Sequence, residues 1–133
     1  MADYAIKNLK QVENMAAKFG FPEDFEARFA RQDLGCERVG ISYQRLGPNA
    51  EGQFGHSHQH DEEVYVIVGG SGRMKLGDQI VDVGAWDAIR VAPETFRAFA
   101  AGPEGLDLLA FGTHTENDAS MQDVAWPGVG DGS

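Results

Sequence analysis

Alternation of apolar and polar residues limits this chain to a β-sheet fold more strongly than any other feature. From Glu37 onward apolar side chains recur at every second position, as in the segment that carries Val39, Ile41 and Tyr43. Turn-forming residues separate about eight such segments, which are 39–44, 53–58, 63–68, 73–76, 79–83, 88–91, 96–100 and 106–111. Short strands at regular spacing predict an all-β fold that closes into a barrel or forms two layers.

The segment 63–68, with the sequence EVYVIV, is apolar on both faces apart from Glu63. A strand of this kind needs apolar cover on both sides. The interior of a barrel or sandwich would cover one face. An N-terminal helical segment or a second subunit would cover the other face, and we therefore expect a homodimer.

Two strand segments flank a glycine-aspartate dipeptide at 77–78 and predict a β-hairpin. A two-residue loop that begins with glycine suits a type II′ turn, because glycine adopts a positive φ readily. In this register Met74 lies opposite Val81 on one face. On the other face we expect an ion pair between Arg73 and Asp82.

The amino-terminal region has a different period. Residues 8–19 place apolar side chains at helical spacing and predict an amphipathic helix, for which Asn8 is a suitable N-cap. After Pro22, Phe25 and Phe29 are four residues apart and indicate a second, short helical turn. We expect the apolar side chains of both pieces to pack into the core.

These patterns divide the chain into three parts. Residues 1–36 form a short helical extension, residues 37–114 form the β-barrel, and residues 115–133 form a flexible tail. The last part is polar, rich in glycine and without a period, and we expect Trp126 to attach to the surface of the barrel.

Composition narrows the classes of partner. The chain has 21 acidic and 11 basic residues, a formal net charge of −10. Such a surface repels phosphate groups, so we expect neither a nucleic acid nor a membrane as partner. The sequence has no apolar run of membrane-spanning length, and its amino terminus lacks the order of a secretory signal. With Cys36 as the single cysteine, an internal disulfide is impossible, and we expect a cytoplasmic protein.

The residue types that carry chemistry are concentrated between Gly52 and Gly72. His56 and His58 are two apart in an extended segment, so both imidazoles project from one face. Glu63 begins the next strand. If the two strands are neighbours, two imidazoles and a carboxylate converge inside the barrel and form a facial set for Fe, Mn, Ni, Cu or Zn.

This stretch resembles the first motif of the cupin superfamily, G-x5-H-x-H-x3,4-E-x6-G. His56, His58, Glu63 and Gly70 match its spacing, although the leading glycine is absent. The resemblance covers roughly residues 39–112. It implies a cupin-type jelly-roll β-barrel with the site at its mouth, in which these two histidines and the glutamate are metal ligands.

The second cupin motif, G-x5-P-x-G-x2-H-x3-N, is not matched. Its positions fall on Trp86, Ala92, Glu94, Arg97 and Ala101. Arg97 therefore replaces the histidine that is the usual fourth ligand of the family. Arginine stays protonated and offers no lone pair to a metal.

Two interpretations of Arg97 remain open at this point. In the first, three ligands hold the metal, Arg97 grips an anionic substrate, and Tyr65 and Phe99 line the pocket. In the second, Arg97 takes the place of the metal. Its charge then pairs with Glu63 or Glu62, and the histidines only form hydrogen bonds.

Other residues near the motif have simpler interpretations. His60 lies in the turn between the two strands and is a reserve fourth ligand, although we expect it to face solvent. Glu62 could supply the carboxylate in place of Glu63 if that turn is one residue tighter. His114 follows the last strand, and we expect it to be exposed.

Two classes of function follow. In the first, a small cupin with one divalent transition metal binds, and as an enzyme would oxidise or isomerise, a small anionic or sugar-like molecule. In the second, a non-catalytic, metal-free module binds a ligand, with Arg97 paired to Glu63 or gripping a ligand carboxylate. The sequence carries no nucleophile elbow, phosphate-binding loop or dinucleotide fingerprint, so whether the protein is an enzyme stays open.

Overall fold

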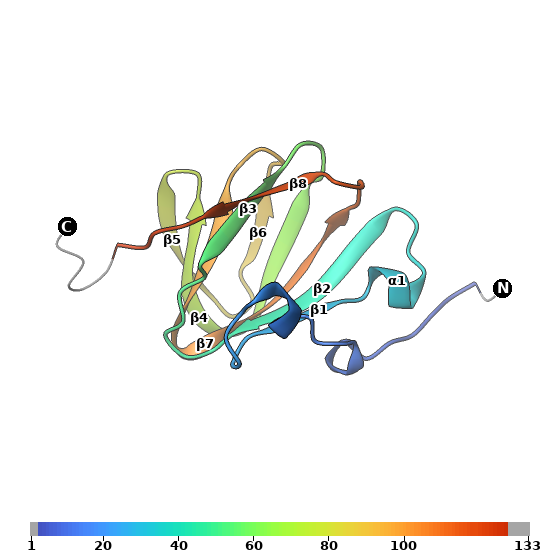
Figure 1. Cartoon of the computed structure of the whole chain (residues 1–133), viewed down its shortest axis with the longest axis horizontal. Helices are drawn as coiled ribbons and strands as arrows, with labels where there is room; N and C mark the ends of the chain where they lie inside the picture. The colour runs from blue at the N-terminus through green and yellow to red at the C-terminus, as the bar shows by residue number, and fades with distance from the viewer. Residues whose placement is uncertain (1–2, 128–133) are drawn as a thin grey trace.

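A computed structural model describes residues 3–127, which form an eight-stranded, curled sheet with short helical turns (Figure 1). The elements are η1 (Leu9–Gln11), η2 (Ala17–Phe19), β1 (Glu26–Phe29), α1 (Arg31–Leu34), β2 (Val39–Leu46), β3 (Phe54–His58), β4 (Glu63–Leu76), β5 (Gln79–Gly84), β6 (Ala88–Val91), β7 (Arg97–Thr113) and β8 (Ala119–Asp123). The predicted all-β fold is confirmed. Within the described residues no helix has the length and apolar character needed to cross a bilayer.

The long strand β7 organises the sheet. It pairs with β2, β3 and β4, and β4 also pairs with β5 and β6. The β4–β7 ladder shifts register between Ile67 and Gly69 and again between Gly70 and Gly72. Shifts of this kind bend both strands, which is how a sheet curls into a barrel. At Gly70, φ is 72° and a Cβ would overlap the carbonyl oxygen of Gly105, so the bend requires glycine.

The core lies inside the curl of the sheet. Its most deeply buried apolar side chains come from β4, β6 and β7 and are Tyr65, Ile67, Met74, Val91, Leu106 and Leu108. In β4 and β7 buried residues alternate with half-buried ones along part of their length, as the period of two predicts.

The opposite face of β4 is only partly covered. Val64, Val66 and Val68 are half-buried there. The N-terminal turn η1 packs against β1 and β2. The N-terminal cover that the sequence led us to expect therefore lies over a different part of the sheet.

The predicted hairpin between β4 and β5 is confirmed in register. Met74 lies opposite Val81 and Arg73 opposite Asp82, and Gly77 has a φ of 60°. The expected ion pair is wrong, however. Arg73 instead pairs with Glu51 at 3.0 Å, and its guanidinium lies over the ring of Trp126.

The predicted helix over residues 8–19 is wrong. Only two short 3₁₀ turns form, and between them the side chain of Asn14 accepts hydrogen bonds from the amides of Ala16 and Ala27 at 3.0 Å each. These bonds tie the segment to β1 and hold it out of a continuous helix. Val12 and Ala16 are still buried. The apolar pattern therefore correctly indicated which residues pack into the core, but not that the segment is helical.

Both predicted boundaries of the barrel also need correction. The second expected helical turn, with Phe25 and Phe29, contains strand β1, which pairs with β2. Residues 119–123 form β8, which lies along β3 (Figure 1), so the prediction of a flexible tail is wrong for this segment. Trp126 Nε1 donates to the carbonyl of Gly52 at 2.9 Å, as its expected attachment requires. Residues 128–133 of the predicted tail lie outside the described residues.

Candidate metal and ligand site

The functional side chains reach a common point from two strands that are both paired to β7. His56, in β3, lies opposite Arg97 at the start of β7, and Glu63, the first residue of β4, lies opposite Gly112 near its end. The turn 59–62 connects the two strands directly. The donors therefore converge even though β3 and β4 are not hydrogen-bonded neighbours.

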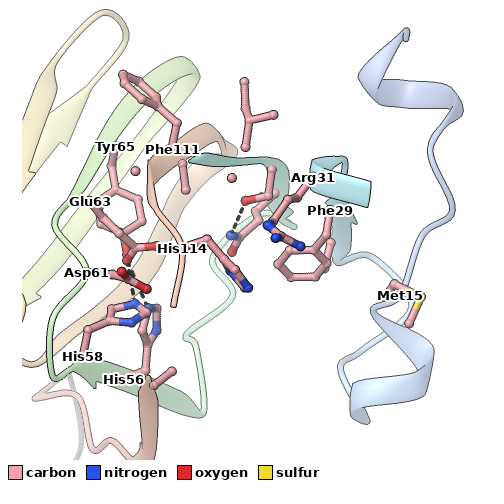
Figure 2. Close-up of a pocket in the computed structure, with 18 of the residues that line it drawn as sticks. Met15, Phe29, Arg31, His56, His58, Asp61, Glu63, Tyr65, Phe111 and His114 are labelled. Atoms are coloured by element: carbon pink, nitrogen blue, oxygen red, sulfur yellow. Dashed lines mark hydrogen bonds and ion pairs between the residues drawn. The ribbon is translucent and has the colours of Figure 1, made fainter. Parts of the chain in front are cut away.

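The predicted convergence of His56, His58 and Glu63 is present in the structure. One ligand atom from each lies within 4.8 Å of the others. Oε1 of Glu63 is 3.2 Å from Nε2 of His56 and 3.2 Å from Nε2 of His58. Figure 2 shows the two imidazoles facing the carboxylate at one end of a cavity.

Arg97 is buried against the same carboxylate. Its side chain is 0% exposed, and Nη1 donates to Glu63 Oε1 at 2.6 Å. The guanidinium also donates to the carbonyls of Ala92, Pro93 and Thr95 at 2.8, 3.1 and 3.0 Å. With each of its nitrogens engaged in this way, Arg97 holds Glu63 in place.

Tyr65 completes the contacts of Glu63. Its hydroxyl donates to Glu63 Oε1 at 2.5 Å, and its ring packs edge-on against Phe99 with 5.0 Å between centroids. Burial, followed by the charge of Glu63, raises the pKa of Tyr65 well above its ordinary value. The phenol therefore stays protonated and remains a hydrogen-bond donor to the carboxylate.

Glu63 itself remains ionised. Burial is the largest single influence and by itself would raise the pKa of this carboxyl. Hydrogen bonds with His56 and Tyr65, together with the charges of His56 and His58, outweigh burial and lower the pKa to about 2. A permanent negative charge therefore stands beside the two imidazoles.

His58 is placed between two carboxylates. Its Nδ1 lies 3.3 Å from Oδ2 of Asp118, a residue that precedes β8. The amides of His60 and Asp61 donate to Asp118 and fix its orientation. In proteins a metal-binding imidazole commonly has such an acidic partner on its second nitrogen, which sets the direction of the ring.

The donor set fits a divalent transition metal. Both ring nitrogens of His58 are buried and lack an aligned hydrogen-bond partner, although carboxylates lie 3.2 and 3.3 Å away. An uncompensated buried lone pair is costly, and a metal ion at Nε2 would use it. Two imidazoles and one carboxylate suit Fe, Mn, Ni, Cu and Zn alike.

A cavity of about 960 Å³ opens from this cluster (Figure 2). Tyr65, Phe99 and Arg97 lie at its inner end with the histidines, so the structure places all three predicted pocket residues there. The cavity continues along β2 and the end of β7 to the N-terminal segment. Its lining there includes Met15, Phe29, Arg31, Ile41, Phe111 and His114.

The reserve residues lie apart from the cluster. His60 is exposed, and Glu62 is exposed and pairs with Arg90 at 2.5 Å. His114 is exposed, as we expected, and it also lines the cavity, with 34% of its side chain accessible. His114 directly follows β7, whose pairing with β2 and β4 determines its position, and the sequence has no local signal for this pairing.

Sequence reasoning also missed Asp118 and Arg31. Asp118 stands in a segment without a period, and it reaches His58 only because β8 pairs with β3. Arg31 begins the short helix α1 and faces the cavity from the other side. A lone acid in a polar stretch and a lone arginine among charged residues carry no pattern by which they could have been found.

Comparison with known proteins bears on the fold. No protein-family model matches the chain, and no curated protein sequence matches it significantly. A solved cupin protein from Bacteroides fragilis is similar, with a TM-score of 0.70 and 20% identity over 100% of this chain and 98% of that chain. The polyketide cyclase RemF from Streptomyces resistomycificus gives a TM-score of 0.71 and 18% identity over 92% of this chain and 87% of that one.

A third similar structure is oxalate decarboxylase from Bacillus subtilis. Its TM-score is 0.70 and its identity 22%, over 87% of this chain but only 32% of the longer enzyme. Together these likenesses show that the chain has the cupin fold, the jelly-roll β-barrel that its first motif implied. The neighbours that share the fold differ in what they do, so the function has to be argued from the site.

Proposed function

We propose that this protein binds one divalent transition metal through His56, His58 and Glu63 and uses it to bind a small anionic molecule in the adjoining cavity. One observation carries the proposal: three ligand atoms of suitable type converge at the inner end of a large cavity. A bound metal would supply Lewis-acid polarisation of an oxygen of the ligand. The chain's own residues orient the donors and exclude water.

Charge balance favours an anionic ligand. The imidazoles that bind a metal are neutral, and the charge of Glu63 is already paired with that of Arg97 at 2.6 Å. A divalent ion would therefore leave an excess of positive charge in a partly buried site. A carboxylate, an enolate or a phosphate on the ligand would offset this excess, whereas a neutral sugar would not.

Arg97 has a positioning role in this proposal. It is held by three backbone carbonyls and directs its remaining contact to Glu63. Tyr65 donates to the same oxygen, Oε1. Because Arg97 and Tyr65 fix Glu63 from two sides, its carboxylate keeps one orientation toward the histidines. The three ligands are therefore already arranged for a metal before it binds.

The Arg97–Glu63 ion pair also supports a second candidate, a metal-free binding module. In that case the pair is electrically complete without an ion, and His56 Nε2 donates to Glu63 at 3.2 Å. The cavity would then hold its ligand through the histidines and the apolar walls alone. Proteins of similar fold have been described as a sugar phosphate isomerase and as a polyketide cyclase, so we leave the reaction type unassigned.

Metal analysis separates the two candidates. We expect untagged protein supplemented with Mn, Fe, Ni, Cu and Zn in turn to retain about one equivalent of at least one of them, and His56→Ala and His58→Ala to lose it. His114→Ala is the matched control, because it removes an imidazole from the same cavity outside the cluster. Retention below about a tenth of an equivalent for all five metals would contradict the metal proposal and favour the module.

We also propose that the protein is a cytoplasmic homodimer. The half-buried face of Val64, Val66 and Val68, which η1 does not cover, supports a second copy as its partner. Light scattering at micromolar concentration should give twice the monomer mass of 14.4 kDa. A monomeric mass, or a dimer that persists when Val66 is replaced by Lys, would contradict this interface.

A further inference from the structure

The cavity is much larger than a ligand confined to the His56–His58–Glu63 cluster would need. At about 960 Å³ it lies near the upper end of the range for drug-sized ligands, roughly 300–1,000 Å³. It extends from the cluster past His114 to Arg31 and Phe29 (Figure 2). A two-carbon acid or a single small sugar would fill only a fraction of it.

The walls between the two ends are mainly apolar. Large hydrophobic side chains line them, and several are incompletely buried, as their exposed fractions show. They are Phe19 at 51%, Phe29 at 45%, Phe54 at 39%, Phe111 at 43% and Met121 at 61%. A row of exposed aromatic side chains around one cavity fits a ligand with an apolar, flat body.

Arg31 supplies an unpaired cation in these walls. Within residues 3–127 its side chain has neither an ion-pair partner nor a hydrogen bond, and its Nε is buried without a partner. In Arg97, the other arginine of the cavity, each of the three nitrogens already donates to Glu63 or to a backbone carbonyl. The two less exposed acids of the lining, Asp61 and Glu63, likewise already accept hydrogen bonds from other side chains or amides of the protein.

Arg31 lies against strand β2. Its side chain packs over Gly40, where Cδ and Cβ of Arg31 lie 3.8 and 3.9 Å from the place that a Cβ of residue 40 would take, which is ordinary van der Waals contact. Figure 2 shows the guanidinium directed from α1 toward the interior, on the same side as His114. A planar guanidinium with free donors binds a carboxylate through two parallel hydrogen bonds.

We propose that the ligand is an elongated organic acid with a largely apolar body, whose carboxylate is bound by Arg31 while a second anionic oxygen group at its other end faces His56, His58 and Glu63. This inference deepens the proposed function and rests on it for the identity of the reacting end. The anchoring of the carboxylate by Arg31 depends only on the cavity and on this residue. In an acidic protein, the unpaired cation selects the orientation in which the ligand enters.

The test uses para-phenylbenzoate as an elongated apolar acid and para-phenylbenzyl alcohol as its neutral match. Calorimetric titration is performed on the full chain stripped of metal with EDTA, so that no metal competes for the carboxylate. We expect Arg31→Gln to weaken binding of the acid about ten- to a hundredfold and to leave binding of the alcohol unchanged. Arg38→Gln is the matched control: it removes the same charge from an exposed residue outside the cavity, and we expect less than a twofold change.

Other outcomes would overturn the inference. These are equal affinity of the wild type for acid and alcohol, no binding of the acid, or the same affinity in Arg31→Gln as in Arg38→Gln. Arg31→Lys keeps the charge but loses the planar fork, so we expect an intermediate loss. If Arg31→Gln fails to fold, the acid-to-alcohol preference of Arg31→Lys decides the question, and an unchanged preference contradicts the proposal.

The same experiment separates this inference from the proposed function. If the protein retains no metal but Arg31 still controls binding of the acid, the metal proposal fails and the anchor stands. If metal binds stoichiometrically and Arg31→Gln has no effect on the acid, the metal proposal stands and the anchor fails. Repeating the titration with Mn-loaded and Zn-loaded protein and biphenyl-4,4′-dicarboxylate, which carries a second carboxylate at its far end, shows whether both ends act on one ligand, because metal should then raise the affinity further.

Discussion

Two clusters in this protein are built from the same three chemical groups. Outside the cavity, Tyr43 and Arg45 on β2 contact Asp107 on β7, at 2.6 and 2.9 Å. Inside it, Tyr65 and Arg97 contact Glu63, at 2.5 and 2.6 Å. Each cluster thus contains a phenol, a guanidinium and a carboxylate within hydrogen-bond distance.

The clusters differ in how the carboxylate is shared. The phenol and the guanidinium take separate oxygens of Asp107, and the side chains of Arg45 and Asp107 are 28% and 24% exposed. All four partners of Glu63, two of them imidazoles, instead contact the single oxygen Oε1. Within residues 3–127, Oε2 of Glu63 has no hydrogen-bond or ion-pair partner.

The comparison separates structure from function. The outer cluster is electrically balanced, joins two neighbouring strands and needs nothing further, so we interpret it as structural. The inner cluster has the same ion pair and phenol, plus two imidazoles whose nitrogens are poorly satisfied and a cavity beside them. The outer cluster is therefore a natural control for every experiment on the inner one.

The largest expected difference is in folding stability without metal. Glu63→Ala leaves the buried guanidinium of Arg97 unpaired, so we expect it to lower the free energy of unfolding by about 3–5 kcal/mol. Asp107→Ala removes a partly exposed carboxylate, and we expect a loss of about 1 kcal/mol. Urea unfolding in EDTA measures both. Equal losses would mean that the two ion pairs are energetically alike and would remove the basis of the comparison.

Metal should stabilise the protein through the inner cluster alone. At a free metal concentration about a hundred times Kd, binding to the folded state adds about 3 kcal/mol to the free energy of unfolding. We expect this gain in the wild type and in Asp107→Asn, and no gain in His58→Ala. Thermal unfolding with and without each of the five metals measures it. A gain that survives in His58→Ala would place the metal elsewhere.

A third experiment concerns the tyrosine of the outer cluster at high pH. Burial, then the hydrogen bond to Asp107 and its charge, raise the pKa of Tyr43 beyond its usual range. A group whose pKa is raised by folding contributes stability below its unfolded pKa, about 10, and loses that contribution as pH rises further.

The expected loss is about 1.4 kcal/mol per pH unit for each such tyrosine. Tyr43→Phe should therefore show a shallower decline in the free energy of unfolding between about pH 10 and 11 than the wild type does. Urea unfolding over this range measures the slope. The remaining decline would include the contribution of Tyr65, whose pKa is also raised. Identical slopes in the two proteins would show that Tyr43 ionises freely.

The sequence predicted features that depend on nearby residues. The Met74–Val81 register followed from a two-residue turn, and the meeting of His56 with Glu63 followed from strict alternation across a short connection. Both are local geometry, in which few arrangements are possible. The resemblance of the first motif to the cupin superfamily implied the fold of the whole barrel, and the similar solved structures confirm that fold.

Features that depend on distant pairing could not be predicted. Strand β8 has no alternation of apolar and polar residues, because all of its side chains are exposed. Its partner β3 lies far from it in the sequence. Val12 and Ala16 show helical spacing, yet Asn14 between them binds β1 and prevents the helix. Arg31 reaches the cavity only through the placement of α1 over β2, which no local pattern encodes.

The smallest effect that we predict concerns the arginine of the outer cluster. Arg45→Gln breaks a partly exposed ion pair at 2.9 Å, and such pairs contribute about 0.2–1 kcal/mol because water and salt screen them. We expect a loss within this range, with metal retention and binding of para-phenylbenzoate unchanged. Arg97→Gln is the comparison, because it removes a guanidinium with 0% exposure and leaves Glu63 without its cation. If Arg45→Gln lowered the free energy of unfolding as much as Arg97→Gln, exposure would not distinguish the two clusters. The functional difference between them would then have to lie in the two imidazoles.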